Sequence, residues 1–151
     1  MTDVTPDRVT AAYAALLTGD RAKITEYWSE DVRFHAPGQH RFAGWHEGLD
    51  SFLEYMTGVY VASGGSWRTD VLHSIIDGEH SVELVKVHAV RAGAKPDSTS
   101  PFDVLDITGA QVMRWEDGKV VEGTAGYFGD GATNANQWWS PVGPDGVRRD
   151  T

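Results

Sequence analysis

Residues 67–90 read WRTDVLHSIIDGEHSVELVKVHAV, which is two segments of period-two character around a short polar turn. The turn, Asp77-Gly78-Glu79-His80, contains the Asp-Gly pair that tight hairpins favour. A second pair of such segments, residues 102–115 and 119–128, flanks Asp117-Gly118. We therefore expect two long antiparallel hairpins in the second half of the chain, separated by a loop over residues 92–100.

The first half of the chain has helical periodicity instead. Thr5 is placed to cap a helix that ends near Gly19, and its apolar residues recur at i, i+3, i+4 and i+7. Asp20 is expected to cap a short second helix, which runs to the break at Glu30-Asp31. A third helical face covers residues 46–60, with Gly58 weakening its last turn.

Short strands are expected at residues 32–36 and 41–43, between the second and third helices. Helices followed by long hairpins predict an α+β domain with the helices on one face of the sheet. We expect this single domain to span residues 1–140, followed by a loose C-terminal tail over residues 141–151. Three helices on a strongly curved antiparallel or mixed sheet would form a half-open cone with an apolar hollow between helices and sheet.

Composition excludes several classes of function. The 151 residues contain 13 Lys and Arg against 22 Asp and Glu, and the net charge of −9 disfavours nucleic acid and anionic membrane partners. No apolar run is long enough to span a bilayer, and the N-terminus lacks the pattern of an export signal. The absence of cysteine excludes disulfides and thiol catalysis, and a cytoplasmic location is expected.

Several motifs carry a resemblance to a known family. They include YAALLTGD at residues 13–20, YWSEDV at 27–32, HAPG at 35–38, and the end of the chain from Val112 to Ser140. Over roughly residues 5–140 the sequence resembles the nuclear transport factor 2-like superfamily, and within it the SnoaL-like polyketide cyclases and ketosteroid isomerase. The resemblance implies the cone-shaped α+β barrel described above and a homodimer packed through the outer face of the sheet.

The three catalytic positions of the isomerase can be compared one at a time. That enzyme, a worked example of pKa tuning, uses a carboxylate base and an oxyanion hole of a tyrosine and a neutral aspartic acid. By the resemblance these positions are Ala12, Ala36 and Gln111 here. Tyr13 neighbours the first of them but lies about 100° around the helix, so it is not expected to replace the tyrosine. Ketosteroid isomerase activity is therefore not expected.

Two other residues are candidates to polarise a substrate oxygen. Alternation places Tyr127 and Gln111 on the inner faces of the last two strands, where they offer a hydroxyl and an amide. The alternative for Tyr127 is a space-filling role with a hydrogen bond to a backbone carbonyl. On this reading, six apolar residues bind the substrate: Trp28, Phe34, Phe52, Met56, Met113 and Ala125.

Histidines and aspartates are the candidates for proton transfer. His35 lies beside the base position of the family, although strict alternation turns it outward unless a bulge intervenes. His88 could line the mouth of the cone. SnoaL-like cyclases use an inward carboxylate, and Asp103, Asp106 and Asp130 are the positions considered for it, with Asp103 retained as a candidate. The spacing of the histidines matches no metal signature, so no metal and no cofactor are predicted.

These observations favour a cofactor-independent enzyme that cyclises, isomerises or hydrates a hydrophobic polyketide- or terpenoid-like molecule. The alternative is a binding or interaction module that uses the same fold without catalysis. The replaced isomerase positions fit both hypotheses.

Overall fold

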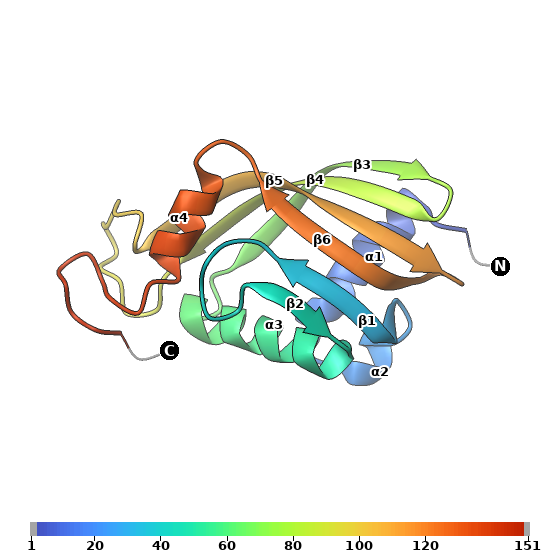
Figure 1. The fold of residues 1–151 in the computed structure, drawn as a ribbon, viewed down its shortest axis with the longest axis horizontal. Coiled ribbons are helices and arrows are strands. Elements are labelled where there is room, and N and C mark those ends of the chain that lie inside the picture. Colours follow the sequence, from blue (N-terminus) through green and yellow to red (C-terminus); the bar gives the residue numbers. More distant parts are fainter. Residues whose placement is uncertain (1–2, 150–151) are drawn as a thin grey trace.

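The protein is an α+β domain built on one six-stranded mixed sheet, as the computed structural model shows for residues 3–149 (Figure 1). The strand order is β2-β1-β6-β5-β4-β3, with β1 parallel to β6 and every other pair antiparallel. Edge strands β2 and β3 do not meet, so the sheet is curved but open rather than a closed barrel. The strands are β1 (Trp28–Ala36), β2 (Gly44–Glu47), β3 (Arg68–Asp77), β4 (His80–Val90), β5 (Val104–Glu116) and β6 (Lys119–Tyr127).

Four helices accompany the sheet in the described part of the chain, one more than expected to close its face. Helix α1 packs against β3, whereas α3 packs against β1 and β2, so the two helices flank the central strands. Helix α4 packs against β5 and β6 and follows the last strand directly (Figure 1). The helices are α1 (Pro6–Leu17), α2 (Arg21–Ile24), α3 (Leu49–Ser63) and α4 (Gly131–Trp138).

The two predicted helix caps are confirmed. The Thr5 side chain accepts a hydrogen bond from the backbone N–H of Arg8, and that of Asp20 accepts one from Ala22. The predicted extent of the second helix is wrong, because the chain leaves α2 at Ile24 and already pairs with β6 from Trp28 onward. Trp28 is therefore a residue of β1 rather than of a helix, and its indole donates to the carbonyl of Ala12 at 2.9 Å.

The segment from β2 to α3 is shifted relative to the prediction. Strand β2 starts at Gly44, and α3 covers residues 49–63 instead of 46–60. Gly64 ends the helix in the left-handed conformation, with φ of 57°. Gly58 does not weaken the last turn but lies inside the helix, where a Cβ atom would come within 2.3 Å of the Phe42 ring. The glycine thus lets the β1–β2 loop pack onto α3.

The inner face of the sheet carries the core. The register aligns Ser81, Met113, Gly123 and Phe34 across four neighbouring strands. At Gly123 a Cβ atom would come within 2.9 Å of both the Phe34 ring and the Met113 sulfur, so these two side chains pack over the glycine. Phe34 and Trp28 in turn pack on Phe52 of α3, with ring centroids 4.8 and 5.1 Å apart.

The residues after Pro141 fold back onto the domain. A turn closes between Gly143 and Val147, and Arg149 donates to the carbonyl of Phe102 at 2.9 Å. The part of this segment up to Arg149 is therefore held by hydrogen bonds, although the sequence suggested a loose tail. Within residues 3–149 no helix combines the length and the apolarity required to cross a bilayer.

Candidate acid–base site

A row of three residues crosses the inner face of the sheet between the flanking helices. Glu83 of β4 is paired with Gln111 of β5, which is paired with Ala125 of β6. Directly paired residues of antiparallel strands point to the same face, with Cβ atoms about 5 Å apart. The side chains of Glu83 and Gln111 are therefore neighbours on the core side of the sheet.

Glu83 is completely buried, with 0% of its surface exposed. Its Oε1 accepts a hydrogen bond from the Ser81 hydroxyl at 3.0 Å, and that hydroxyl accepts one from the Trp115 indole N–H at 2.9 Å. Its Oε2 has no hydrogen-bond partner among residues 3–149. The Trp115–Ser81 chain thus orients the carboxyl group and leaves one oxygen for another partner.

The pKa of Glu83 is raised from 4.5 to about 7. Burial is the main cause, since it penalises the charged carboxylate, and the hydrogen bond from Ser81 offsets only part of that penalty. No ion pair within the described chain compensates the charge. A carboxyl with a pKa near 7 can both take up and release a proton at neutral pH.

Tyr13 reaches this row from α1. Its hydroxyl donates to Oε1 of Gln111 in a short hydrogen bond, and its ring packs edge-on against Trp28 with centroids 6.5 Å apart. Burial and the nearby Glu83 hold the pKa of Tyr13 well above its usual value. Tyr13 therefore lies next to Gln111, although the sequence did not lead us to expect it in the site. Ala12 is itself buried in the core, and its backbone carbonyl accepts the hydrogen bond from the Trp28 indole.

Tyr127 lies one row further along the same face. It is paired with Gly109, where a Cβ atom would come within 3.2 Å of the tyrosine ring, so the ring leans over the glycine towards β5. Tyr127 is half-buried, and burial raises its pKa to about 12. Its hydroxyl therefore stays protonated at neutral pH and can act as a donor. Gln111 and Tyr127 lie on the same face of the sheet in neighbouring rows, the face that alternation predicted for both.

The two candidate histidines do not join this group. His35 packs edge-on against Trp45 at 5.0 Å, and its neighbours Phe34 and Ala36 are the buried ones. Alternation therefore predicted its outward direction correctly. His88 is paired with Arg68 and Asp106 on the face opposite to Glu83. A proton carried by either histidine would be separated from Gln111 by the sheet.

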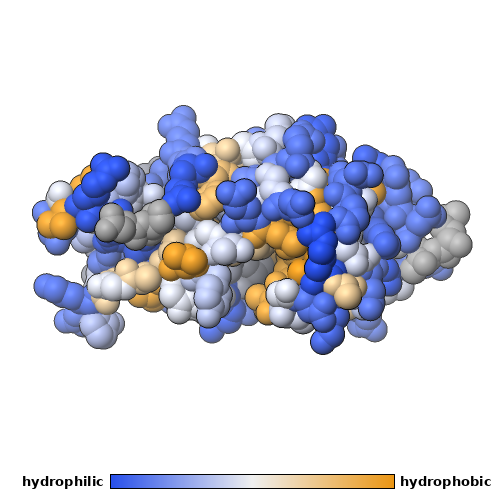
Figure 2. Space-filling model, turned by 90° about the horizontal axis from the view of Figure 1, so that it is seen from below, coloured by the Kyte–Doolittle hydropathy of each residue, from blue (hydrophilic) through white to orange (hydrophobic). Residues whose placement is uncertain are grey.

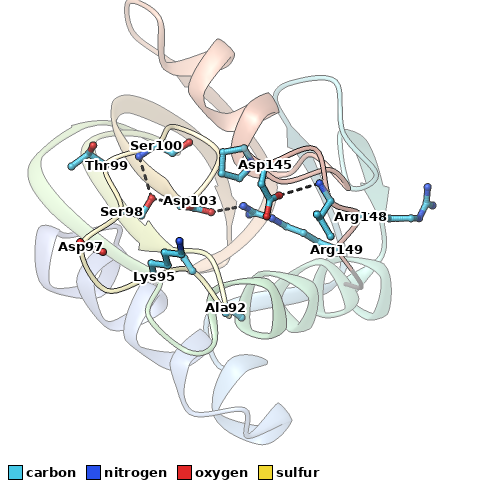
Figure 3. Close-up of a pocket in the computed structure, with 14 residues that line it drawn as sticks. Ala92, Lys95, Asp97, Ser98, Thr99, Ser100, Asp103, Asp145, Arg148 and Arg149 are labelled. Atoms are coloured by element: carbon cyan, nitrogen blue, oxygen red, sulfur yellow. Dashed lines mark hydrogen bonds and ion pairs between the residues drawn. The ribbon is translucent and has the colours of Figure 1, made fainter.

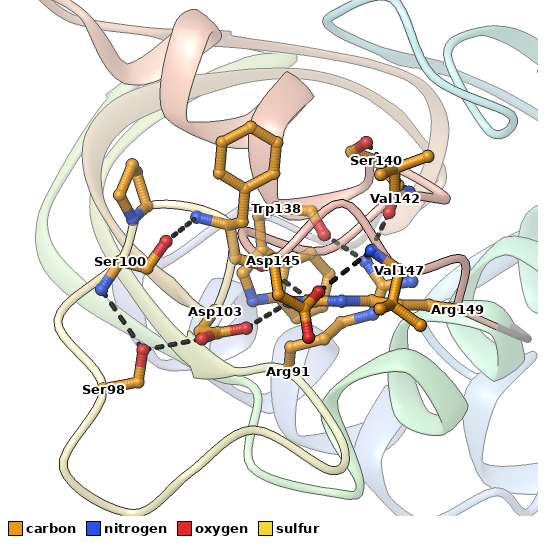
Figure 4. A network of polar contacts seen from close by, with 12 residues as sticks. Arg91, Ser98, Ser100, Asp103, Trp138, Ser140, Val142, Asp145, Val147 and Arg149 are labelled. Atoms are coloured by element: carbon orange, nitrogen blue, oxygen red, sulfur yellow. Dashed lines mark hydrogen bonds and ion pairs between the residues drawn. The ribbon is translucent and has the colours of Figure 1, made fainter.

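Asp103 is buried, yet it belongs to another region. It lines a recess of about 610 Å³ between the loop at residues 92–100 and the C-terminal segment (Figure 3). Its carboxylate accepts from Ser98 at 2.6 Å and pairs with Arg149 (Figure 4). Burial alone would raise the pKa of Asp103, but these two partners outweigh it and lower that pKa. Asp103 is thus held as a charged structural partner, away from the row of Glu83.

The residues predicted to bind substrate form much of the core. Trp28, Phe34, Phe52 and Met113 are less than 5% exposed, Ala125 is 9% exposed, and Met56 is half-buried. Apolar side chains gather near the middle of the side on which α3 lies, with hydrophilic residues around them (Figure 2). Partly buried apolar residues packed against the core include Tyr13, Leu16, Leu53, Met56 and Tyr127.

Glu83 is the residue that the sequence reasoning missed. Its signal in the sequence is one carboxylate in the alternating set Ser81, Glu83, Val85, Val87 and Ala89, but this set reveals Glu83 only once the structure shows which face of β4 is buried. Asp106 and Asp130, which were considered for the inward carboxylate, are both exposed. Across residues 3–149 no cluster of three or more His, Asp and Glu is arranged to hold a metal ion.

Comparison with known protein families identifies the family of this chain. The SnoaL-like domain matches residues 9–123, which contain Tyr13, Glu83 and Gln111. The chain belongs to the SnoaL-like family. A SnoaL-like fold of the nuclear transport factor 2 type explains the open, curved sheet with helices on its inner side, as the sequence resemblance implied.

Similar proteins range from uncharacterized relatives to solved structures. An uncharacterized protein of Mycobacterium tuberculosis is 29% identical to this SnoaL-like chain over 115 residues. The match covers 74% of this chain and 86% of the mycobacterial protein. The structure of Bal32a, from a soil-derived mobile gene cassette, is 23% identical with a TM-score of 0.75, covering 89% and 95% of the two chains. TerC, co-crystallised with polyporic acid, is 17% identical with a TM-score of 0.65, covering 80% and 88%. The two structural likenesses establish the fold.

Proposed function

We propose that this protein is a cofactor-independent acid–base enzyme that moves a proton on a hydrophobic, polyketide-like ketone. The observation that carries the proposal is the buried carboxyl of Glu83, whose Oε2 has no partner and whose pKa is near 7. A carboxyl that only stabilised the fold would be paired with a cation, as Asp103 is with Arg149.

The substrate oxygen would be bound by Tyr13 and Gln111. In the free protein the Tyr13 hydroxyl donates to Gln111, whose amide N–H₂ group provides two further donors. When a ketone enters, its carbonyl oxygen takes the place of Oε1 of Gln111 as the acceptor of the Tyr13 hydrogen bond. Donors aimed at an oxygen on which negative charge develops stabilise an enolate strongly in a water-poor site.

The ionised Glu83 then takes the proton from the carbon next to the carbonyl. The electron pair of that C–H bond forms the C=C bond of the enolate, and the carbonyl π electrons move to the oxygen. Glu83 returns the proton to another carbon in an isomerisation. In a cyclisation the enolate carbon attacks a second carbonyl carbon of the same molecule, the π electrons of that carbonyl move to its oxygen, and this oxygen takes the proton from Glu83. Ser81 is a positioning residue, because it fixes Oε1 and leaves Oε2 for the reaction.

Access to Glu83 depends on the hydrogen bond between Tyr13 and Gln111. Glu83 has no exposed surface, whereas Tyr13 and Gln111 are both half-buried. A ligand therefore meets the Tyr13–Gln111 pair first and reaches the carboxyl when that pair separates. This order would keep water away from the carboxyl until a ligand is bound.

Deuterium exchange of 2-tetralone, a flat ketone with acidic C–H groups, tests the proposal. In D₂O the protein should accelerate incorporation of deuterium beside the carbonyl, followed by mass spectrometry. Glu83→Gln should lower the acceleration at least 100-fold, the usual size of a general-base contribution. The rate of the wild-type protein should rise with pH through about 7, where Glu83 ionises.

Glu79→Gln serves as the matched control, because Glu79 is an exposed residue of the turn that leads into β4. It should exchange 2-tetralone at the wild-type rate. Equal rates for Glu83→Gln and the wild type would remove Glu83 from the chemistry. Binding of 2-tetralone without any acceleration by the wild type would contradict the enzyme and favour a binding module.

A further inference from the structure

The β1–β2 loop (residues 37–43) lies between α3 and the end of α4 (Figure 1). Its Phe42 ring packs over Gly58 of α3 and is half-buried against the core. The ring also faces two core residues, Tyr55 and Trp139, with centroids 5.6 and 5.4 Å away, and each of these is only 4% exposed. The loop thus covers the apolar interior at this end of the domain.

Glycines lie near both ends of the β1–β2 loop. Gly38 and Gly44 have φ of 110° and 98°, in the region that side chains disfavour. At Gly38 a Cβ atom would come within 2.8 Å of the Asn136 side chain of α4, and the neighbouring Gln39 amide donates to that side chain at 2.7 Å. Since a few residues at the ends of a loop can absorb the rotation of a lid, the two glycines are suited to act as hinges.

His40 fastens the loop through contacts that require its neutral form. Its Nδ1 accepts a hydrogen bond from the backbone N–H of Phe42 at 3.2 Å, and its Nε2 lies 3.0 Å from the carbonyl oxygen of Pro37. A backbone N–H only donates and a carbonyl only accepts, so Nδ1 is unprotonated and Nε2 carries the proton. The ring also stacks on Trp139, with centroids 5.1 Å apart and planes inclined by 13°. Neutral His40 therefore holds the loop closed against the end of α4.

Protonation of His40 breaks this arrangement. A proton on Nδ1 points at the N–H of Phe42, so two donors face each other and the hydrogen bond is lost. Burial lowers the pKa of His40, the hydrogen bond to Pro37 opposes this, and a positive charge on His46 lowers the pKa further. A pKa lowered in the closed loop means that closure is favoured above the ordinary histidine pKa of about 6.5 and is weakened as the pH falls through the lower value.

His46 of β2 also contacts the loop, but its contacts survive protonation. Its Nε2 donates to the carbonyl of Phe42 at 2.6 Å, and its Nδ1 lies 3.1 Å from the Ser51 hydroxyl. A hydroxyl can donate to a neutral ring nitrogen or accept from a protonated one. His46 therefore holds the loop in either charge state, whereas His40 holds it only when neutral.

Other groups packed around the loop do not compensate a charge on His40. Tyr55 of α3 is neutral, because burial holds its pKa well above the usual value. Arg41 is a cation whose guanidinium lies 4.5 Å from the centroid of the Phe42 ring. The contacts from α4 described above carry no charge, and no carboxylate among residues 3–149 forms an ion pair with His40. A proton on His40 therefore has no counter-charge in the closed loop.

We infer that the β1–β2 loop is a pH-sensitive lid over the apolar interior, with His40 as its latch and Phe42 as its cover. With His40 neutral the lid is closed. When Nδ1 takes up a proton from solvent, the loop is released at its two glycines and Phe42 moves away from Tyr55 and Trp139. The lid is independent of the proposed function, since it concerns entry to the interior and requires nothing of Glu83.

Amide hydrogen exchange followed by NMR tests the lid in the wild-type protein at about pH 8 and about pH 5, on either side of the ordinary histidine pKa. The protection factor of the Phe42 amide, which corrects for the intrinsic effect of pH on exchange, should fall about fivefold at the lower pH, the effect of one lost neutral hydrogen bond. Amides of β5, which is paired on both sides, are the reference for changes in the whole fold. Equal protection of Phe42 at the two pH values, relative to that reference, would overturn the lid.

His40→Phe separates the latch from its neighbours. Phenylalanine keeps a ring against Trp139 but removes both nitrogens, so the Phe42 amide should be about fivefold less protected at the higher pH and should show no further loss at the lower one. His46→Phe is the matched control and should keep the dependence on pH, because His40 is intact. A pH dependence that survives in His40→Phe, or that disappears only in His46→Phe, would contradict His40 as the latch.

A nitrogen-15 NMR titration of the His40 ring gives a second readout without any substitution. At the higher pH Nδ1 should be unprotonated and Nε2 protonated, and the Phe42 amide should lose protection at the midpoint at which Nδ1 takes up its proton. Protonation of His40 without a change at Phe42 would overturn the lid. Glu83→Gln should show the same pH dependence of Phe42, although its exchange of 2-tetralone is expected to be slow. The lid and the proposed base can therefore fail separately.

Discussion

Within residues 3–149 two carboxyl groups are buried, and their electrostatic settings are opposite. Asp103 is 6% exposed and is surrounded by Ser98 and Arg149, so its pKa is lowered. Glu83 is 0% exposed and receives only the Ser81 hydroxyl, so its pKa is raised to about 7. Burial raises the pKa of both groups, and the ion pair with Arg149 is what separates Asp103 from Glu83. A buried carboxyl without a cation is the feature that distinguishes a proton-transfer group from a structural one.

Asp103→Asn removes the charge from the paired carboxyl and should give the largest change in stability. It leaves Arg149, and the buried Arg91 near it, without their counter-charge, so the free energy of unfolding at pH 7 should fall by about 3 kcal/mol. The lowered pKa of Asp103 means that its stabilisation is present above the unfolded pKa of about 3.9 and is lost as the pH falls through the folded value. The difference between variant and wild type should therefore vanish near pH 2.

Urea denaturation at several pH values measures this effect. Asp106→Asn is the control, since Asp106 forms an exposed ion pair with Lys86 at 3.5 Å and should cost less than about 0.5 kcal/mol. Equal losses for the two variants would show that burial of the Asp103–Arg149 pair contributes nothing to the stability.

Glu83→Gln should have the opposite pH dependence. The pKa of Glu83 is higher in the folded protein than in the unfolded chain. The contribution of Glu83 to the free energy of unfolding is therefore most favourable below pH 4.5 and is lost as the pH rises through about 7. Near pH 5 the variant and the wild type should therefore be similarly stable. At pH 8 the variant should be more stable by about 2 kcal/mol, because it avoids burying a charge. Urea titrations at the two pH values check this, and a variant that is less stable at pH 8 contradicts it.

Ser81→Ala gives a smaller, more local effect on the unpaired carboxyl. The Ser81 hydroxyl favours the charged form of Glu83, so its removal should raise the pKa of Glu83 further, by less than about one unit. The midpoint of the pH profile for 2-tetralone exchange should move upward by the same amount. A midpoint that stays in place would show that Ser81 does not act on the reacting carboxyl.

The architecture was largely predictable because its local determinants are strong. Thr5 and Asp20 cap their helices, and the Asp-Gly turns at residues 77 and 117 join the expected hairpins. The start of β1 at Trp28 was missed because the Tyr27-Trp28 pair also fits a helical face. The pairing with β6, a contact between residues far apart in sequence, decides its conformation.

The site was only partly predictable. Gln111 and Tyr127 follow from alternation along the last hairpin, and the structure places both on the inner face. Glu83 was missed because both faces of β4 are apolar: Val82 and Leu84 lie on one, and Val85 and Val87 on the other. Alternation alone does not identify the core face in such a strand. The direction of Tyr13 depends on the rotation of α1 against the sheet, which local sequence does not determine.

The most direct test of the contrast between the two carboxyls is a carbon-13 NMR titration of the Glu83 side chain. Its carboxyl resonance is assigned by its disappearance in Glu83→Gln, and Asp103 is followed in the same spectra. The account predicts a midpoint of about 7 for Glu83 and one below 3.8 for Asp103. A Glu83 midpoint below 5 would show that the buried carboxyl is already ionised and compensated, and it would contradict the proposed acid–base role.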